Sequence, residues 1–214
     1  MAERDSVDIR HVARVFDAEA DTYDQRHQND PARSRRYRMI EGPQLAAVVG
    51  LRRVLEIGCG TGRLISQVRG CYRFGIDVSA GMLARAAQKP VKVVRADAHQ
   101  LPFGAGTFDG ILAGDAVFSY LELPRALAEC ARILRPLGTL VVHLFGPGFE
   151  RRPGSRELTS LKDIAVLARA AGFSLQRELL WLNLPHFPHV VRVPRLEISV
   201  GRFHHAVVVL RLRR

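Results

Sequence analysis

The chain has 214 residues, 47% of them hydrophobic, which is enough for one α/β domain with a substantial core. No apolar run reaches the ~18 residues of a membrane helix, the three cysteines lack disulfide or metal spacing, and the charged N-terminus has no signal segment, so we expect a cytoplasmic protein. The net charge of +11 invites a nucleic-acid-binding interpretation, but only three of the 32 basic residues are lysines, which is typical of an arginine-rich composition as much as of a binding site.

Strands and helices alternate along most of the chain. Residues 1–38 are polar with a helical pattern, residues 39–50 predict a helix that ends at Gly50, and residues 182–194, with three prolines, predict a connecting loop. We predict strands over 54–57, 72–76, 91–96, 108–113, 139–144, 174–181 and 206–212, and helices over 63–68, 81–88, 125–134 and 161–171. This alternation predicts a doubly wound α/β fold with a mainly parallel seven-stranded sheet, and a ligand site at the carboxyl ends of its strands.

The glycines after the first predicted strand are the most informative pattern of the chain. The apolar run Val54–Ile57 leads into Gly58, Gly60 and Gly62 in the spacing G-x-G-x-G, and a helix-like segment follows. A buried strand that ends in a glycine-rich turn and a helix begins a nucleotide-binding α/β fold. Glycine lets the backbone approach a ligand where a Cβ would intervene, and the small side chain of Cys59 fits within the turn.

Spacing and charge separate two ligands that such a turn can bind. Dinucleotide-binding proteins use G-x-G-x-x-G around a pyrophosphate, whereas here the third glycine comes one residue earlier. The run from Glu56 to Gly62 resembles the E/D-x-G-x-G-x-G motif of the class I S-adenosylmethionine-dependent methyltransferases. The carboxylate of Glu56 would repel phosphate but suits a cationic ligand. The alternative is an ordinary strand-to-helix turn without a ligand.

Acidic residues close the next two predicted strands. Asp77 can accept hydrogen bonds from both ribose hydroxyls, and helix capping is its alternative role, which Ser79 can fill instead. Asp97 and Ala98 resemble the start of the family's D-A-x-x-L-P-F segment, in which the aspartate accepts from the adenine amino group and the next N–H meets the ring. A turn aspartate is the alternative there. With Val78, these residues complete the expected cofactor site.

Three further segments carry the resemblance. Residues 108–112 are similar to the F-D-x-V start of the fourth strand, and residues 126–140 to A-L-x-E-x-x-R-V-L-K-P-G-G-x-L, with Leu137 in place of the first glycine. Residues 16–24 are similar to F-D-x-x-A-x-x-Y-D, a pattern of the type-11-like group that includes quinone-ring C-methyltransferases and malonyl-carrier-protein O-methyltransferases. In relatives this segment helps to cover the cofactor.

The resemblance implies a Rossmann-like methyltransferase fold whose last strand is antiparallel. It also implies two regions, an N-terminal helical cap over residues 1–50 and a cofactor-binding core over residues 51–214. The cofactor would be S-adenosylmethionine and the product S-adenosylhomocysteine.

Methyl transfer from a sulfonium mainly requires the nucleophile to be held in line behind the methyl group. A general base helps where the nucleophile loses a proton. The resemblance puts Asp115, just after the fourth strand, and Tyr23, in the expected cap, near that methyl group, and Asp115 also counts with the cofactor site. His143, within the fifth strand, is a further candidate, with a packed core histidine as the alternative.

The sequence favours methyl transfer to a small-molecule or carrier-bound metabolite. The basic charge supports an RNA methyltransferase as the alternative, although no N-P-P-Y-type motif follows the fourth strand. A protein that binds the cofactor or a partner without catalysis is a third hypothesis. We expect no metal, because His186, His189, His204 and His205 lack acidic or cysteine partners at ligand spacing.

Overall fold

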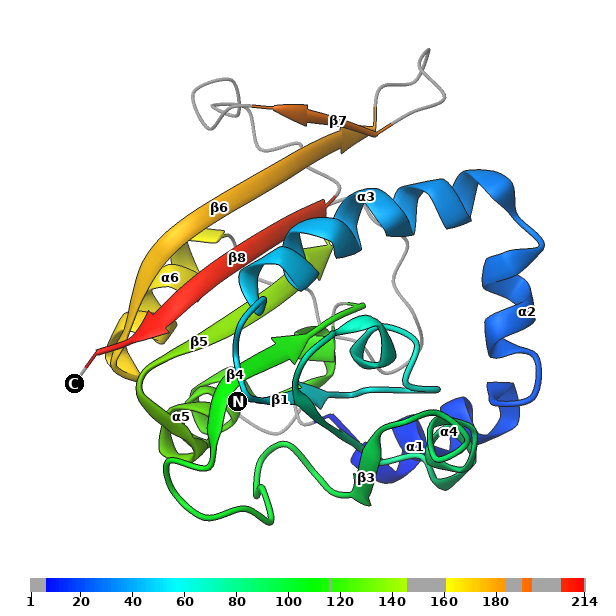
Figure 1. Cartoon of the computed structure of the whole chain (residues 1–214), viewed down its shortest axis with the longest axis horizontal. Coiled ribbons are helices and arrows are strands. Elements are labelled where there is room, and N and C mark those ends of the chain that lie inside the picture. Colours follow the sequence, from blue (N-terminus) through cyan, green and yellow to red (C-terminus); the bar gives the residue numbers. More distant parts are fainter. Residues whose placement is uncertain (1–6, 116, 146–160, 184–189, 194–204, 214) are drawn as a thin grey trace, which may run out of the picture.

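The computed structural model describes residues 7–115, 117–145, 161–183, 190–193 and 205–213. Its centre is an eight-stranded sheet in the order β3-β2-β1-β4-β5-β8-β6-β7 (Figure 1). The strands are β1 (Arg53–Ile57), β2 (Tyr72–Asp77), β3 (Lys92–Arg95), β4 (Phe108–Ala113), β5 (Leu134–Phe145), β6 (Phe173–Asn183), β7 (Val190–Val193) and β8 (His205–Leu212). The helices are α1 (Ile9–Glu19), α2 (Tyr23–Gln28), α3 (Pro31–Ala47), α4 (Ala80–Ala86), α5 (Leu123–Ile133) and α6 (Leu161–Ala170), with 3-10 turns η1 (Ile65–Gln67) and η2 (Val117–Tyr120).

The sheet confirms the predicted topology. The first five strands are parallel to one another, and β8, the last strand, runs antiparallel between β5 and β6. All seven predicted strands are present. The eighth, β7, lies within the segment that we predicted as a loop, and it pairs antiparallel with the end of β6. The residues of β7 itself include no proline, so each keeps a backbone N–H for pairing.

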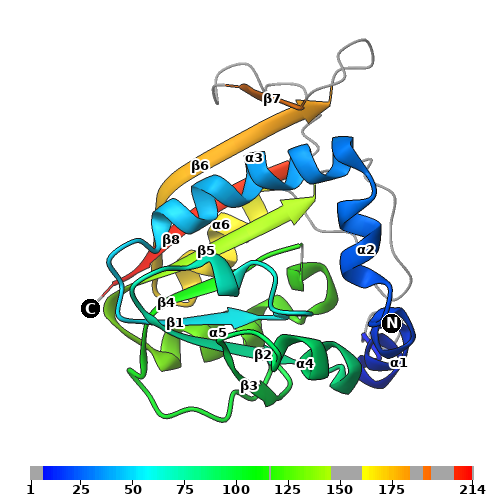
Figure 2. The ribbon, with the colours of Figure 1, turned by 45° about the vertical axis from the view of Figure 1, so that its right-hand side comes forward.

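Each face of the sheet carries its own hydrophobic core. Side chains alternate along β5, so that Leu140 and Val142 belong to the buried cluster that includes residues of α5 and α6, whereas Val141 belongs to the cluster that includes residues of α3 and α4. Figures 1 and 2 show α3 lying across β5 and β8 on one face, with α6 on the opposite face. Because helices cover both faces of the sheet, a ligand-binding site is expected at the carboxyl ends of the parallel strands.

The predicted helix over residues 63–68 is only a short 3-10 turn, η1. In an α-helix the N–H of Ile65 would bond to the carbonyl of Thr61. Instead, that N–H donates to Oε2 of Glu56 at 3.0 Å, and the carbonyl of Thr61 accepts from Nζ of Lys89 at 2.7 Å. Both partners of the helical bond are therefore engaged elsewhere, and the chain remains a tight turn.

The predicted helix over residues 39–50 is the second half of the longer α3. That helix starts at Pro31, whose fixed φ suits a first helical position, and it continues through Pro43. Gly50 follows the helix with a φ of +81°, which agrees with the predicted stop.

Leu137 adopts a backbone conformation that favours glycine. Its φ is +62°, and its side chain is 53% exposed. This is the position at which the related motif has its first glycine, so the irregular start of β5, where its register with β4 shifts, keeps the glycine geometry although a side chain is present.

Replacing Leu137 by glycine should stabilise the protein. The left-handed conformation costs a residue with a Cβ about 1–2 kcal/mol, and the greater freedom of glycine in the unfolded chain offsets part of that gain. We expect the unfolding free energy in urea to rise by about 1 kcal/mol. Leu137→Ala is the matched control, because it removes the exposed side chain and keeps the Cβ. Equal gains from both variants would contradict the explanation by backbone strain.

Candidate active site

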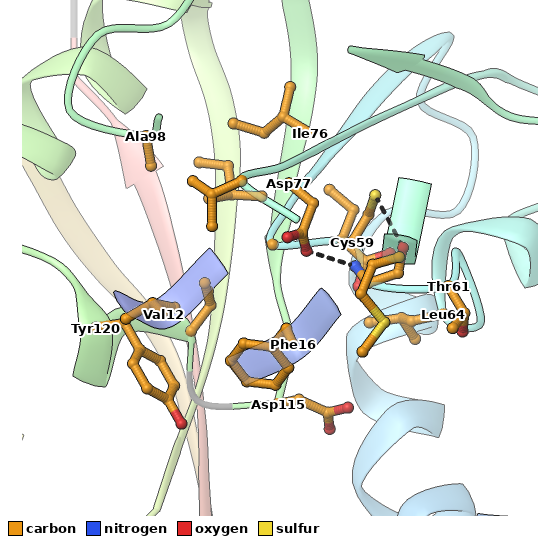
Figure 3. A pocket seen from close by; sticks show the side chains of 18 of the residues that line it. Val12, Phe16, Cys59, Thr61, Leu64, Ile76, Asp77, Ala98, Asp115 and Tyr120 are labelled. Atoms are coloured by element: carbon orange, nitrogen blue, oxygen red, sulfur yellow. Dashed lines mark hydrogen bonds between the residues drawn. The ribbon is translucent and has the colours of Figure 1, made fainter. Parts of the chain in front are cut away.

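A pocket opens at the carboxyl ends of β1, β2 and β4, between the sheet and the N-terminal helices (Figure 3). The sequence-predicted residues that line it are Tyr23, Glu56, Gly58, Cys59, Gly60, Asp77, Val78, Asp97, Ala98 and Asp115. Two predicted residues, Gly62 and His143, are not part of the lining. The folding of the chain thus brings together side chains from separate segments of the sequence.

The three glycines of the turn after β1 meet different requirements, although all have positive φ values. A Cβ on Gly58 would lie 2.4 Å from Cγ2 of Val117, and one on Gly62 would lie 3.2 Å from Cβ of Ala86. Packing therefore excludes larger residues at these two positions. Gly60 lines the pocket, and a Cβ there would meet no protein atom within 4 Å. Gly60 is thus the position in this turn where close approach of a ligand, and not protein packing, is the reason for a glycine.

Asp77 ties the end of β2 to this turn. Its Oδ2 accepts a hydrogen bond from the N–H of Gly60 at 2.9 Å, and its Oδ1 accepts one from the N–H of Ser79 at 2.9 Å (Figure 3 shows the first). Burial raises the pKa of Asp77. Ser79 itself caps α4, because its Oγ accepts from the N–H of Met82 at 3.1 Å. The carboxylate of Asp77 is therefore free of the capping role and lies in the pocket wall.

Glu56 is a buried carboxyl group in the same wall. The residue is only 4% exposed, and the N–H of Ile65 donates to its carboxyl group. Burial raises the pKa of Glu56 well above its ordinary value, and the neighbouring charge of Asp115 acts in the same direction. A nearby positive charge would favour the ionised form, so the position suits a cationic ligand.

Asp97 takes part in a small network of its own. Its Oδ1 accepts from the N–H of His99 at 2.9 Å and from Nδ1 of the same ring at 2.6 Å, while Nε2 of His99 accepts from the N–H of Glu122 at 2.7 Å. The turn role that we considered for Asp97 is thus present. It also fixes the orientation of a carboxylate that lines the pocket beside Ala98.

Arg63 joins three parts of the fold, and our sequence analysis missed it. Its guanidinium forms ion pairs with Glu41 of α3 and, at 3.3 Å, with Asp115, whose φ of +44° puts it in the left-handed region. The same group lies 4.6 Å from the centroid of the Tyr37 ring. Glu41 and Gln44 line the pocket with Arg63. Glu41 and Gln44 lie three residues apart, so they share one face of a helix, and this polar pair among apolar residues was the signal in the sequence that could have indicated the site.

Two aspartates fasten the N-terminal helices to the core. Asp17 accepts from Oγ of Ser79 at 2.6 Å, and this hydrogen bond lowers the pKa of Asp17. Asp24 accepts from Oγ1 of Thr61 at 2.6 Å and pairs with Nζ of Lys89 at 3.1 Å. The hydroxyl groups of Ser79 and Thr61 lie beside the pocket wall. The contacts that attach α1 and α2 to the core are therefore next to the pocket.

The other members of the F-D-x-x-A-x-x-Y-D pattern also have visible roles. Phe16 and Tyr23 line the pocket, and Phe16 makes an edge-to-face contact with Tyr120 at 5.8 Å between centroids (Figure 3). Ala20 packs closely on Gly81 of α4, where an added Cβ would lie 3.1 Å from that of Ala20. The motif therefore encodes both the attachment and the apolar wall.

His143 lies inside the sheet. It is 1% exposed, its ring is 5.2 Å from that of Phe145 in an edge-to-face contact, and burial lowers its pKa to about 3. A ring that stays neutral and packed in β5 supports the alternative of a core histidine.

The described residues contain no group of three His, Cys, Asp or Glu side chains arranged to hold a metal ion. His186, His189 and His204 lie outside them. No helix within the described ranges is long and apolar enough to cross a membrane.

Comparison with known proteins agrees with this geometry. Residues 55–142 match the family model described as "Methyltransferase domain". A solved S-adenosylmethionine-dependent methyltransferase of Thermotoga maritima, described as a possible histamine N-methyltransferase, is 21% identical and superposes with a TM-score of 0.71 over 94% of this chain and 99% of that one. The chain therefore carries, over residues 55–142, the sequence pattern of a methyltransferase domain.

The proteins that resemble this chain in sequence are named for different methyl acceptors. The chain is 33% identical to a malonyl-[acyl-carrier protein] O-methyltransferase of Halorhodospira halophila, over 66% of this chain and 50% of that protein. It is 30% identical to a demethylmenaquinone methyltransferase of Corynebacterium urealyticum, over 66% of this chain and 64% of that protein. The matches span between 29% and 52% of the lengths of the first four curated relatives.

Replacing Glu56 by glutamine should change how the stability of the domain depends on pH. The folded pKa of Glu56 lies above its ordinary value of 4.5 because of burial, so its contribution to stability is present below pH 4.5 and is lost as pH rises through the folded pKa. The glutamine amide would keep an acceptor for the N–H of Ile65 without this loss. We expect Glu56→Gln to gain unfolding free energy over wild type as pH rises above 4.5, by up to about 1.4 kcal/mol per pH unit.

Urea unfolding at a series of pH values measures this difference. Glu122→Gln is the matched control, because Glu122 lies outside the pocket with its side chain half exposed, and we expect parallel curves for it and wild type. Parallel curves for Glu56→Gln and wild type would contradict the assignment of Glu56 as a buried, destabilised carboxylate.

Proposed function

We propose that this protein transfers the methyl group of S-adenosylmethionine to a small-molecule or carrier-bound metabolite. The observation that carries the proposal is the convergence of the glycine turn, Asp77, Asp97 and Asp115 on one pocket. These groups follow four neighbouring parallel strands, as a cofactor spanning the switch point requires.

The residues present fit this cofactor. Asp77 would bind the ribose hydroxyls, Asp97 and Ala98 the adenine, and the backbone around Gly60 the chain between adenosine and amino acid. The open Cβ direction at Gly60 and the acidic lining match a ligand that approaches the backbone closely and carries positive charge. When bound, the cofactor supplies an electrophilic methyl group, and the protein's task is to position the acceptor.

Tyr23, Phe16 and Tyr120 form the aromatic part of the pocket, which suits the body of an organic acceptor. Asp115 is the group that we propose as general base where the acceptor loses a proton. Its ion pair with Arg63 holds the carboxylate just beyond the end of β4.

The charge of the lining favours an acceptor without a carboxylate close to the reacting atom. The carboxyl groups in the lining are Glu41, Glu56, Asp77, Asp97 and Asp115. Among the described lining residues, Arg63 is the one arginine or lysine, and two carboxylates already pair with it. An acidic acceptor would therefore meet repulsion, whereas a neutral or amine acceptor would not.

We further propose that α1 and α2 act as a cap over the bound cofactor. The attachment of Asp17 and Asp24 to Ser79 and Thr61 supports this role. Closure by these contacts would exclude water from the transferring methyl group.

A surface cluster bears on the alternative of RNA methylation. Arg52, Arg53, Lys92 and Arg135 surround Tyr72 and Phe74 in an open hollow. Cationic and aromatic side chains of this kind suit a polyanion. However, they stand at the starts of β1, β2, β3 and β5, whereas the pocket lies at the ends of parallel strands. RNA bound at this cluster would not present a base to the pocket, so we retain the small-molecule acceptor.

Calorimetric titration with S-adenosylmethionine, S-adenosylhomocysteine and NAD tests the proposal. We expect micromolar binding of the first two and none of NAD. Asp77→Ala should weaken binding by about 1–3 kcal/mol, the scale of lost hydrogen bonds to a charged group. Asp163→Ala is the matched control, because it removes an exposed aspartate of α6 that lies outside the pocket lining, and its affinity should stay near wild type. No binding of either cofactor form by the wild type would overturn the proposed function.

A further inference from the structure

The amide of Gln44 in α3 is buried with one unmet hydrogen-bonding group. The residue is 1% exposed, and its Nε2 donates to the carbonyl of Ile40 at 3.2 Å. Its Oε1 is buried and has no hydrogen-bond partner among the residues that the structure describes. An unpaired buried acceptor is unfavourable, because it loses water without gaining a donor. Because Gln44 lines the pocket, a donor on a ligand can remove this cost.

The position of Oε1 indicates which part of a ligand reaches it. A Cβ placed on Gly114, just after β4, would lie 3.3 Å from Oε1 of Glu56 and 3.7 Å from Oε1 of Gln44. The two side-chain oxygens therefore converge on one point beside β4. Asp77 and Asp97, which we assign to adenosine, follow β2 and β3, on the other side of β1 in the sheet order. The donor near Gln44 thus belongs to the end of the ligand away from adenosine.

The charge around this point favours a cation. Glu41, Glu56 and Asp115 lie near one another, and Arg63 is the positive group that balances them. Three carboxyl groups and an amide oxygen lie near one guanidinium, so they outnumber the positive charge and the charged hydrogen-bond donors at this point. An ammonium group supplies both.

We propose that Oε1 of Gln44 accepts a hydrogen bond from the ammonium group of the cofactor's methionine moiety, beside the carboxylate of Glu56. This inference rests on the proposed function, because it assigns one more residue to the same cofactor. Gln44 acts as a neutral acceptor there, so it adds a hydrogen bond without a fourth negative charge next to Glu41.

The test compares ligands that share adenosine and differ at the amino-acid end. Calorimetry would measure the binding of S-adenosylhomocysteine and of 5′-methylthioadenosine, which lacks the amino acid, to wild type and to Gln44→Met. Methionine matches glutamine in length but has no strong acceptor. We expect the affinity for S-adenosylhomocysteine to fall about tenfold, as loss of one hydrogen bond to a charged group implies, and the affinity for 5′-methylthioadenosine to stay unchanged.

A third ligand distinguishes the ammonium from the carboxylate, to which a rotated Gln44 amide would donate. Decarboxylated S-adenosylmethionine keeps the ammonium and lacks the carboxylate. We expect Gln44→Met to weaken its binding about as much as that of S-adenosylhomocysteine. Unchanged binding of the decarboxylated ligand would overturn the proposal in favour of a carboxylate contact.

Two further variants serve as controls for the effect of Gln44→Met on ligand binding. Gln88→Met replaces an exposed glutamine outside the pocket and should bind all three ligands as wild type does. Gln44→Glu keeps an acceptor at the site, and we expect it to retain the affinity for S-adenosylhomocysteine. Equal weakening of S-adenosylhomocysteine and 5′-methylthioadenosine by Gln44→Met, or no weakening of either, would overturn the role of Gln44. Failure of the wild type to bind S-adenosylhomocysteine would instead overturn the proposed function, and this inference with it.

Discussion

Two buried carboxyl groups hold the glycine turn in shape, and the site depends on them. Glu56 accepts the N–H of Ile65 and so stops the chain from winding into a helix after β1. Asp77 accepts the N–H of Gly60 and so joins the turn to the neighbouring strand. Burial raises the pKa of each carboxyl group, which means that the fold keeps acidic groups in the pocket wall at a cost. A cationic ligand lowers that cost, so the same interactions that define the turn also create its preference for positive charge.

Carboxylates of the N-terminal segment also hold the region of the glycine turn by accepting hydrogen bonds. Asp17 and Asp24 belong to a segment that is distant in sequence from the turn, yet each carboxylate accepts from a hydroxyl group beside it, at Ser79 and Thr61. Lys89 contacts both Asp24 and the carbonyl of Thr61. The wall of the pocket and the N-terminal helices are therefore coupled through shared hydrogen-bond partners. A change in the conformation of the turn would alter the contacts that hold those helices.

The sequence predicted the parts of the molecule that local chemistry determines. The alternation of strands and helices indicated a parallel sheet, and the glycines, Asp77 and Asp97 stand at strand ends, which meet at one edge of any such sheet. Arg63, Glu41 and Gln44 were missed because their importance arises only when α3 packs over that edge. The short turn η1 was missed for the same reason, since the bonds that interrupt the helix come from β1 and from beyond α4.

The distribution of charge along the strands has a physical consequence of its own. The starts of three strands, β1, β3 and β5, carry the basic cluster of Arg52, Arg53, Lys92 and Arg135, and the ends of the parallel strands carry the acidic pocket. The described part of the molecule therefore separates a basic cluster from an acidic pocket at opposite ends of the parallel strands, within a chain of strongly positive net charge. A small cation would be attracted to the acidic mouth of the pocket, and its rate of association there would fall as salt screens the field.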